Sequence, residues 1–196
     1  MAKVKGPLFS LSASGKLADT LVYMTWKGIQ DVRKWLKPAN PNTENQQVQR
    51  GYMTTAVGHW HSVLFIAVDR IAWNLLATVA ASPMSGFNRF IKNVVDMLVA
   101  GKDYVQIWNF ALVAGDEQIS VYCDAGAAGK TLYIRYGTSK TAMINTTVMV
   151  DDADNSYSVT QGGLSNDVLY YVQCYVTLPA EENMNMSGIG EVTPEA

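Results

Sequence analysis

The clearest strand pattern in the chain is Asn155-Ser-Tyr-Ser-Val-Thr-Gln-Gly-Gly-Leu164-Ser-Asn-Asp-Val-Leu-Tyr170-Tyr-Val-Gln-Cys174-Tyr-Val176. Apolar and polar residues alternate over Ser156–Thr160 and again over Val168–Thr177. This period of two is typical of strands with one buried face. The segment between the runs is rich in Gly, Ser, Asn and Asp, which form turns. The stretch therefore predicts two strands joined by a turn-rich connection.

The same pattern extends outward through the C-terminal half. Further runs cover Gln118–Asp124, Thr131–Tyr136 and Met143–Val150, and Ile189–Thr193 is suited to a last strand. Short strands at a spacing of roughly 8–12 residues indicate an all-β domain, which we expect to be a β-sandwich over residues 102–196. Counting in twos predicts its inward face: Ile119, Val121, Cys123, Leu132, Ile134, Tyr136, Tyr170, Val172, Cys174 and Val176.

Upstream of this half, the sequence has the signals of three short helices. Thr43 is suited to an N-cap, with Gln46 completing a capping box. An apolar stripe then recurs every four residues, at Val48, Tyr52, Ala56 and Trp60. A second helix is predicted for Val68–Ala80, with Ile71, Ala72, Leu75, Leu76 and Val79 facing inward, and Ser82-Pro83 is expected to end it. A third begins after the cap Ser85 and ends at Gly101, where glycine is preferred.

The N-terminal residues read as an extended arm. Leu21–Trp26 and Ile29–Leu36 flank Lys27-Gly28, which predicts a hairpin with a two-residue turn. Neither face of this hairpin is cleanly apolar, so we expect it to lean on the helices or on a neighbouring subunit. Pro38 and Pro41 mark a linker. The chain is thus predicted to be α+β, with an extended basic arm over 1–42, a helical layer over 43–101 and the sandwich over 102–196.

Charge is distributed unevenly, although the net charge is only −2. Residues 1–50 carry eight Lys/Arg and three Asp/Glu, whereas residues 103–196 carry three Lys/Arg and twelve Asp/Glu. Such an asymmetry fits head-to-tail contacts or an arm that seeks a negative surface, and it also occurs on ordinary solvated faces. Charged residues make up only 16% of the chain, below the usual figure of about a quarter, which suggests a surface partly covered by other subunits.

The residue types that carry chemistry form no recognisable site. His59 and His61 are two positions apart on a predicted helix, which excludes the paired-histidine metal arrangement with a spacing of four. Cys123 and Cys174 fall on inward strand positions, where a thiol is unreactive. Asp151–Ser156 is interpreted as a solvated turn, with a weak cation site as the alternative. We therefore expect no catalytic residue, no cofactor and no metal.

Two classes of partner are disfavoured. Trp26 and Trp35 lie among basic residues that could meet phosphates, but no nucleic-acid-binding module is recognisable and the net charge is negative. We therefore do not expect nucleic acid to bind. The most apolar stretch, Val63–Ala81, contains Asp69 and Arg70, which a membrane span would disfavour. A helix is expected there, and no membrane partner.

The stretch from Asn155 to Val176 resembles the fifth-to-sixth strand region of a fibronectin type III domain, in which a leucine precedes the corner tyrosine by six residues, as Leu164 precedes Tyr170. The resemblance covers about residues 103–196. It implies an immunoglobulin-like sandwich in which Tyr170 hydrogen-bonds back across the corner. Cys123 stands where that family usually has a tryptophan, so fibronectin-like and generic immunoglobulin-like folds both stay open.

Immunoglobulin domains also place an inter-sheet disulfide on the strands that would carry Cys123 and Cys174. A protein folded in a reducing compartment normally keeps its thiols. We expect two buried thiols here, with a disulfide as the alternative.

Segments of the first half carry a second resemblance: Gly6-Pro-Leu-Phe-Ser-Leu-Ser-Ala-Ser-Gly-Lys-Leu17, Val22-Tyr-Met-Thr-Trp-Lys-Gly28, Pro38-Ala-Asn-Pro-Asn-Thr-Glu-Asn-Gln-Gln-Val-Gln-Arg50, Ala72-Trp-Asn74 and Ser85-Gly-Phe-Asn-Arg-Phe90. They are similar to proteins of tailed-phage and prophage genomes that are taken to be virion structural components. This resemblance covers about residues 1–100 and implies no activity. Phage particles often append immunoglobulin-like domains to capsid or tail proteins, so the two resemblances agree.

Together they predict a non-enzymatic virion structural protein, assembled in the host cytoplasm, that acts as a capsid decoration or minor head protein. A phage tail component, a cell-surface adhesive module, and an enzyme with an accessory sandwich are the alternatives. For an enzyme, the helical half offers only Asp69, Asp96, His59 and His61. Expected partners are copies of the chain, other virion proteins and a host-surface ligand. The residues expected at interfaces are Trp26, Arg33, Trp35, Trp60, Trp73, Phe87 and Phe90, and those with structural roles are Tyr170, Leu164, Cys123 and Cys174.

Overall fold

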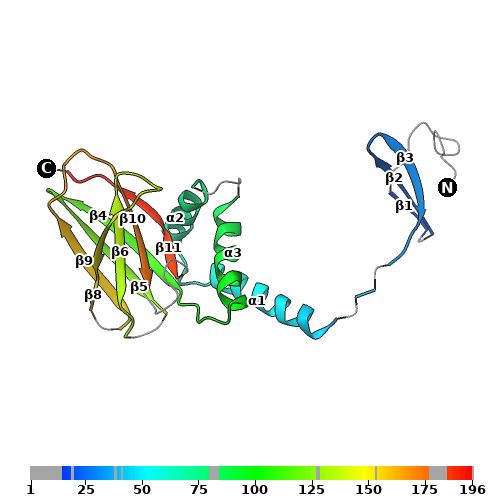
Figure 1. Ribbon diagram of the computed structural model, residues 1–196, viewed down its shortest axis with the longest axis horizontal. Coiled ribbons are helices and arrows are strands. Elements are labelled where there is room, and N and C mark those ends of the chain that lie inside the picture. The colour runs from blue at the N-terminus through cyan, green and yellow to red at the C-terminus, as the bar shows by residue number, and fades with distance from the viewer. Residues whose placement is uncertain are drawn as a thin grey trace. The chain divides into compact units, whose positions relative to one another are not determined.

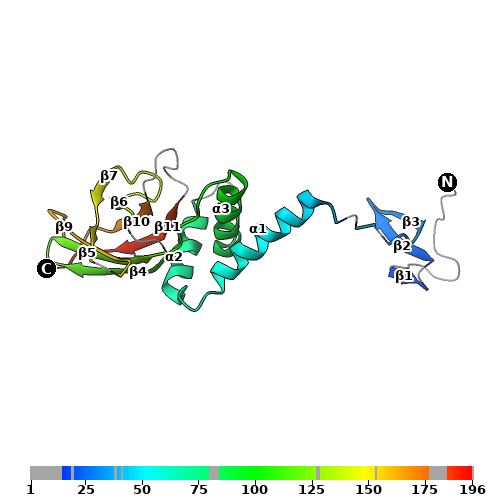
Figure 2. The same ribbon diagram turned by 90° about the horizontal axis from the view of Figure 1, so that it is seen from below.

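The computed structural model describes residues 15–18, 20–37, 39–40, 42–79, 84–126, 129–152, 154–176 and 185–195. The chain divides into two compact units, Met1–Thr43 and Glu44–Ala196. The described residues form three helices and three antiparallel sheets, drawn from two directions in Figures 1 and 2. This confirms the prediction of a mixed α+β chain.

The first unit contains one small sheet of strands β1 (Gly15–Leu17), β2 (Leu21–Trp26) and β3 (Ile29–Lys34), in that order. The predicted hairpin is confirmed, since Trp26 pairs with Ile29 across the turn. Lys27 and Gly28 have φ angles of 48° and 78°, and two positive values in succession are what a type I′ hairpin turn needs. Strand β1 was not predicted, because three residues are too few to show an alternating pattern.

None of the described side chains of this first sheet is buried. Leu17, Trp26, Ile29 and Leu36 are 54%, 63%, 52% and 74% exposed, respectively. Lys16 places its ammonium group 4.8 Å from the centre of the Trp35 ring, which is a cation–π contact on the surface. Within its described residues, the unit therefore has strand pairing but no apolar core. The linker prolines Pro38 and Pro41 lie outside the described residues.

The second unit begins with helices α1 (Glu44–Trp60), α2 (Ala67–Ala77) and α3 (Gly86–Val99), which confirms the three predicted helices. Ser85 caps α3, since its hydroxyl accepts a hydrogen bond from the Asn88 N–H at 3.2 Å. The same helix ends as predicted at Gly101, whose φ is 70°. The N–H groups of Gly101 and Lys102 donate to the carbonyls of Leu98 and Met97, which is the Schellman arrangement. The predicted Ser82-Pro83 stop lies outside the described residues.

Eight strands follow the helices: β4 (Ile107–Gly115), β5 (Gln118–Ala125), β6 (Leu132–Gly137), β7 (Asn145–Val148), β8 (Val150–Asp151), β9 (Ser156–Gly162), β10 (Tyr170–Val176) and β11 (Met186–Val192). They form two antiparallel sheets with the orders β4-β5-β9-β8 and β11-β10-β6-β7. The predicted run Met143–Val150 divides between the sheets at Met149, which is buried and donates its N–H to the Leu132 carbonyl.

Side chains from both of these sheets share one hydrophobic cluster. The residues predicted to face inward all belong to it, with Tyr136 and Tyr170 only partly buried and the other eight fully buried. A period of two along each strand thus identified the buried face correctly.

Helix α2 packs against strands β11 and β4, so the helices and the two sheets form parts of the same compact unit. The predicted boundary between residues 101 and 102 falls inside this unit. Gly188 of β11 permits the contact, because a Cβ atom there would lie 2.3 Å from the carbonyl carbon of Ala72 in the helix backbone. Backbone atoms cannot move aside as the end of a flexible side chain can, so this position accepts no side chain.

The carboxylate of Asp69 joins the start of α2 to strand β4. Its Oδ2 atom accepts hydrogen bonds from the N–H groups of Ile66 at 3.0 Å and Asn109 at 3.2 Å. Its Oδ1 atom accepts from the Phe110 N–H at 3.0 Å. The side chain is 3% exposed. One acidic side chain therefore satisfies donors from two elements that are far apart in sequence.

Strand β4 reaches Asp69 through a β-bulge. The pairing of β4 with β5 shifts register between Trp108 and Ala111, and Asn109 within the shift has a φ of 54°. A bulge leaves residues without ladder partners and redirects them. Here the N–H groups of Asn109 and Phe110 are directed to Asp69. The bulge interrupts the alternation of apolar residues, which explains why β4 was not predicted.

Substituting Gly188 tests the close contact between α2 and β11. We expect Gly188→Ala to lower the free energy of unfolding by about 2 kcal/mol or more, because the methyl group forces a backbone shift in a packed region. Gly162→Ala is the matched control: a Cβ there meets nothing within 4 Å, so its effect should stay within about 0.5 kcal/mol. Urea unfolding of the three proteins measures the difference. Equal losses in both variants would show that α2 does not lie directly on β11.

Substituting Asp69 tests the junction between α2 and β4. Asp69→Ala leaves three backbone N–H groups without their acceptor, so we expect the free energy of unfolding to fall by about 3 kcal/mol or more. Asp69→Asn keeps one acceptor oxygen and should lose less. Chemical unfolding at pH 7 measures both, and a fully stable Asp69→Ala protein would contradict the described junction.

The pH dependence of the same variants provides a second readout. Burial raises the pKa of the Asp69 carboxyl above its ordinary value, an effect that the three N–H donors partly offset. The folded protein therefore keeps this proton to a higher pH than the unfolded chain, in which the pKa of an Asp carboxyl is about 3.9. The part of the stability that depends on this extra proton affinity is full below that pH and is lost as pH rises through the folded pKa, whereas the hydrogen bonds to the carboxylate persist at pH 7. The difference in free energy of unfolding between wild type and Asp69→Asn should therefore be smaller at pH 7 than below about pH 3.9.

Candidate functional site

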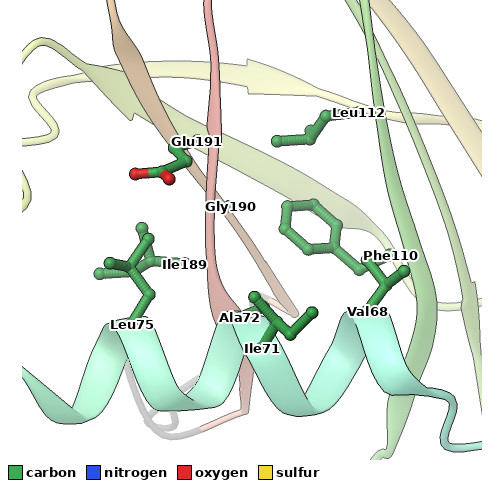
Figure 3. A pocket seen from close by; sticks show the side chains of 9 residues that line it. All are labelled: Val68, Ile71, Ala72, Leu75, Phe110, Leu112, Ile189, Gly190 and Glu191. Atoms are coloured by element: carbon green, nitrogen blue, oxygen red, sulfur yellow. The ribbon is translucent and has the colours of Figure 1, made fainter.

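An apolar groove lies between helix α2 and the strands β4 and β11, and it encloses about 260 Å³ (Figure 3). Its two strand walls are β4 and β11, which are edge strands of different sheets, and α2 packs against both of them. The described residues that line it are Val68, Ile71, Ala72, Leu75, Phe110, Leu112, Ile189, Gly190 and Glu191.

Gly190 forms the middle of the groove because it has no side chain. A Cβ atom at this position would lie 2.5 Å from Leu112 Cδ1 and 2.8 Å from Phe110 Cε1. Any larger residue would displace the two side chains that form the β4 wall, which Figure 3 shows on one side of Gly190. The opposite wall carries Ile189 and Leu75.

The helix side of the groove is open to solvent. Val68 and Ile71 are 49% and 66% exposed, although Ile71 was predicted to face inward. The segment that leads into α2 is also apolar and exposed, at Val63, Leu64 and Ile66. Contiguous exposed apolar side chains are uncommon on a monomer and typically mark a contact surface.

Glu191 is the one ionisable residue among those that line the groove, and its side chain is exposed. An apolar hollow with a single carboxylate at its margin is suited to an apolar group that has a cation beside it. This chemistry describes a binding surface. This surface was not predicted from the sequence. The sequence of α2 did contain an indication of it, because the helix has apolar residues on more faces than a single core contact requires.

The first unit has a second candidate surface, which is basic. A hollow beside β3 is lined by Val22, Trp35, Leu36 and Ala39 together with the cations Arg33, Lys34 and Lys37. Two residues predicted for interfaces, Arg33 and Trp35, therefore lie together here, and Trp26 is exposed on the same small sheet. These three residues are accessible within the chain, and their interface role stays a prediction.

The predicted interface role of Trp73 and Phe90 needs correction. Both are buried in their own chain, at 1% and 0% exposed. Phe90 contacts Trp73 with ring centroids 5.1 Å apart and Trp60 with centroids 5.3 Å apart. Trp60 also meets Phe87 in an edge-on contact at 5.4 Å. The four aromatic residues thus form the core between the helices, and only Trp60 and Phe87 are partly exposed.

The two cysteines are free and buried, as expected. Cys123 Sγ lies 3.8 Å from Met149 Sδ, and the Cys174 N–H donates to the Ser187 hydroxyl at 2.9 Å. Burial is the main reason that the pKa of the Cys174 thiol is raised well above its ordinary value. The reactive thiolate is therefore disfavoured in the folded protein.

Tyr170 makes the hydrogen bond that was predicted for it. Its phenolic oxygen accepts from the Ser165 N–H at 3.2 Å. Leu164, next to Ser165, is buried in the cluster shared by the two sheets, and its N–H donates to the Glu117 carbonyl at 3.0 Å. The tyrosine thus fixes the connection between β9 and β10 from the side of the sheet.

Of the four residues considered for an enzyme, His59, Asp96 and Asp69 are engaged in separate structural contacts, and His61 is exposed. His59 Nδ1 lies 2.8 Å from Gln106 Oε1, while Gln106 Nε2 donates to the His59 carbonyl at 3.1 Å. Asp96 pairs with Lys92 one turn earlier in α3, and Asp69 is held by backbone donors. Among the described residues, no group of three or more His, Cys, Asp or Glu side chains is placed to hold a metal ion.

No helix within the described ranges combines the length and the hydropathy needed to cross a membrane.

No family model and no curated protein sequence matches the chain. Among solved structures it is similar to an engineered protein whose crystal structure was determined at 1.98 Å. The two are 17% identical, the match covers 47% of this chain and 20% of that chain, and the TM-score is 0.34. A likeness at this level carries no argument about family or function.

Thiol labelling tests the state of the two cysteines. We expect a thiol-specific reagent to react with neither Cys123 nor Cys174 in the native protein and with two thiols per chain after unfolding in urea without a reductant. The reason is that both thiols are buried and inaccessible to the reagent, and burial also raises the pKa of the Cys174 thiol. Fewer than two reactive thiols after unfolding would instead indicate a disulfide.

Proposed function

We propose that this chain is a non-enzymatic structural protein of a tailed-phage virion, a capsid decoration or minor head protein that assembles through its N-terminal unit. The observation that carries the proposal is the small sheet β1-β2-β3, none of whose described side chains is buried although three large apolar ones, Leu17, Trp26 and Ile29, are exposed, as is Leu36 just after β3. A sheet with this composition is expected to be completed by another protein surface.

The energetics of small sheets support this reading. Isolated hairpins are marginal in water, and extra strands help only when an apolar face is covered. Covering one large apolar side chain contributes roughly 1.5–3 kcal/mol. Trp26 and Leu36 alone, at 63% and 74% exposed, would therefore contribute several kcal/mol on contact with a partner. This gain is available only on contact with another apolar surface.

Charge supports the same proposal. The unit Met1–Thr43 carries seven Lys/Arg and two Asp/Glu, a net charge of +5. The unit Glu44–Ala196 carries eight Lys/Arg and fifteen Asp/Glu, a net charge of −7. Opposite charges on two units of one chain favour contacts between the basic unit of one copy and the acidic unit of another. Shells and tails are built from many copies, in which such contacts repeat.

The two four-stranded sheets further support an immunoglobulin-like β-sandwich. The order β4-β5-β9-β8 corresponds to strands A-B-E-D of that fold, and β11-β10-β6 corresponds to G-F-C with β7 added at the edge. The hydrogen bond from the Ser165 N–H to Tyr170 lies at the E–F connection, where the tyrosine corner of the family occurs. We propose that this domain projects outward and contacts the host surface or neighbouring virion proteins.

The phage assignment itself rests on the resemblance of residues 1–100 to virion proteins of tailed phages and prophages. A cryo-EM reconstruction of gradient-purified particles of the phage that encodes the chain tests it. We expect density for the helices and the two sheets on the capsid, and peptides of the chain in particles washed with high salt. Density on the tail would favour the tail alternative, and purified particles that lack the chain would contradict the proposal.

A further inference from the structure

We propose that the groove beside α2 receives the hairpin tip Trp26-Lys27-Gly28-Ile29 of a second copy of the same chain. This inference rests on the proposed function in one respect, since it identifies the partner of the N-terminal unit. It joins two surfaces that the structure describes separately, the exposed tip of the first unit and the apolar groove of the second.

The hairpin tip presents two large apolar side chains and one cation together. Trp26 and Ile29 are directly paired across the turn, so their side chains lie on the same face of the sheet. They are 63% and 52% exposed. Lys27 occupies the first turn position between them, and the type I′ geometry makes this loop short and well defined. Little conformational entropy is lost when such a tip docks.

The groove has the size for this tip. A cavity of about 150 Å³ is enough to hold a benzene ring, and the groove encloses about 260 Å³. An indole ring and part of an isoleucine side chain therefore fit the space. The walls are aliphatic and aromatic, at Leu75, Leu112 and Phe110, and they match the apolar character of Trp26 and Ile29.

The charges of the two surfaces are complementary. Glu191 is the ionisable residue that lines the groove, and Lys27 is the charged residue of the tip. A pair of this kind at the margin of an apolar contact adds little affinity but fixes orientation and excludes other partners. The wider charges of +5 on one unit and −7 on the other act in the same direction.

The contact would be head-to-tail, because each copy has one tip and one groove on different surfaces. Head-to-tail contacts build closed rings or open filaments according to the rotation between copies. The apolar residues Val63, Leu64 and Ile66, which precede α2, add exposed area beside the groove that a second copy could cover.

Sedimentation velocity of the full chain over a range of concentrations tests the proposal. We expect wild type to associate, and Trp26→Ser and Ile71→Ser to weaken association at least tenfold. Ile144→Ser is the matched control, because Ile144 is 84% exposed but does not line the groove, and it should associate like wild type. Circular dichroism and thermal unfolding of each variant check that the fold is kept.

A charge swap makes the test specific to the two surfaces. Lys27→Glu and Glu191→Lys should each weaken association, and equimolar mixing of the two variants should restore it because one tip then meets the opposite groove charge. Mixing Lys27→Glu with Trp26→Ser is the control and should restore nothing, because both variants are altered in the tip and neither supplies a wild-type one.

A monomer at all concentrations would overturn the inference, including one in which the tip occupies the groove of its own chain. Association that survives both Trp26→Ser and Ile71→Ser would overturn it as well. These outcomes are separate from the proposed function: a monomeric chain found on virions refutes only the head-to-tail contact, and association through the tip without incorporation into virions refutes only the virion role.

Discussion

The buried carboxylate of Asp69 is the interaction on which the arrangement of the second unit depends. It accepts hydrogen bonds from the N-cap of α2 and from the bulge of β4, so the helix cannot leave the sheet without removing the acceptor of the Asn109 and Phe110 N–H groups. Gly188 then lets the helix backbone lie directly on β11. Together these contacts turn two edge strands, which would otherwise be open to pairing with other chains, into the covered margin of one compact body. The groove is a consequence of the same arrangement, since α2 spans the space between β4 and β11 without filling it.

The two units differ in how far they bury their own apolar side chains. The second unit buries its own apolar residues in two clusters, one between the sheets and one among the helices. The first unit has ordered strand pairing but leaves its apolar side chains at the surface. Such a division suits a subunit whose body is stable before assembly and whose arm gains its stabilisation on contact with a partner.

Local patterns predicted much of this architecture. The turn Lys27-Gly28, the cap Ser85 and the stop at Gly101 depend on a few neighbouring residues, and each is found where expected. The alternating runs predicted five strand regions and their buried faces for the same reason. Strand β4 was not predicted because its bulge breaks the alternation at Asn109. The division of the Met143–Val150 run between two sheets was not predicted either, since nothing local marks where a strand changes its partner. The groove escaped prediction because its walls come from three elements that are separate in the sequence.

The burial of the aromatic residues could not be predicted from the sequence alone. The sequence predicted that Ile71 faces inward and that Trp73 and Phe90 lie at interfaces, but it could not show which of these apolar residues another element of the same chain would cover. Trp73 and Phe90 are in the core, while Ile71 is exposed. Sequence alone was enough to predict the three helices, most of the strands, several caps and turns, and the uneven charge of the two units, because these follow from residues close together in the chain. Which apolar faces are covered became clear only from the fold, because that depends on contacts such as the one between Asp69 and Phe110, 41 positions apart.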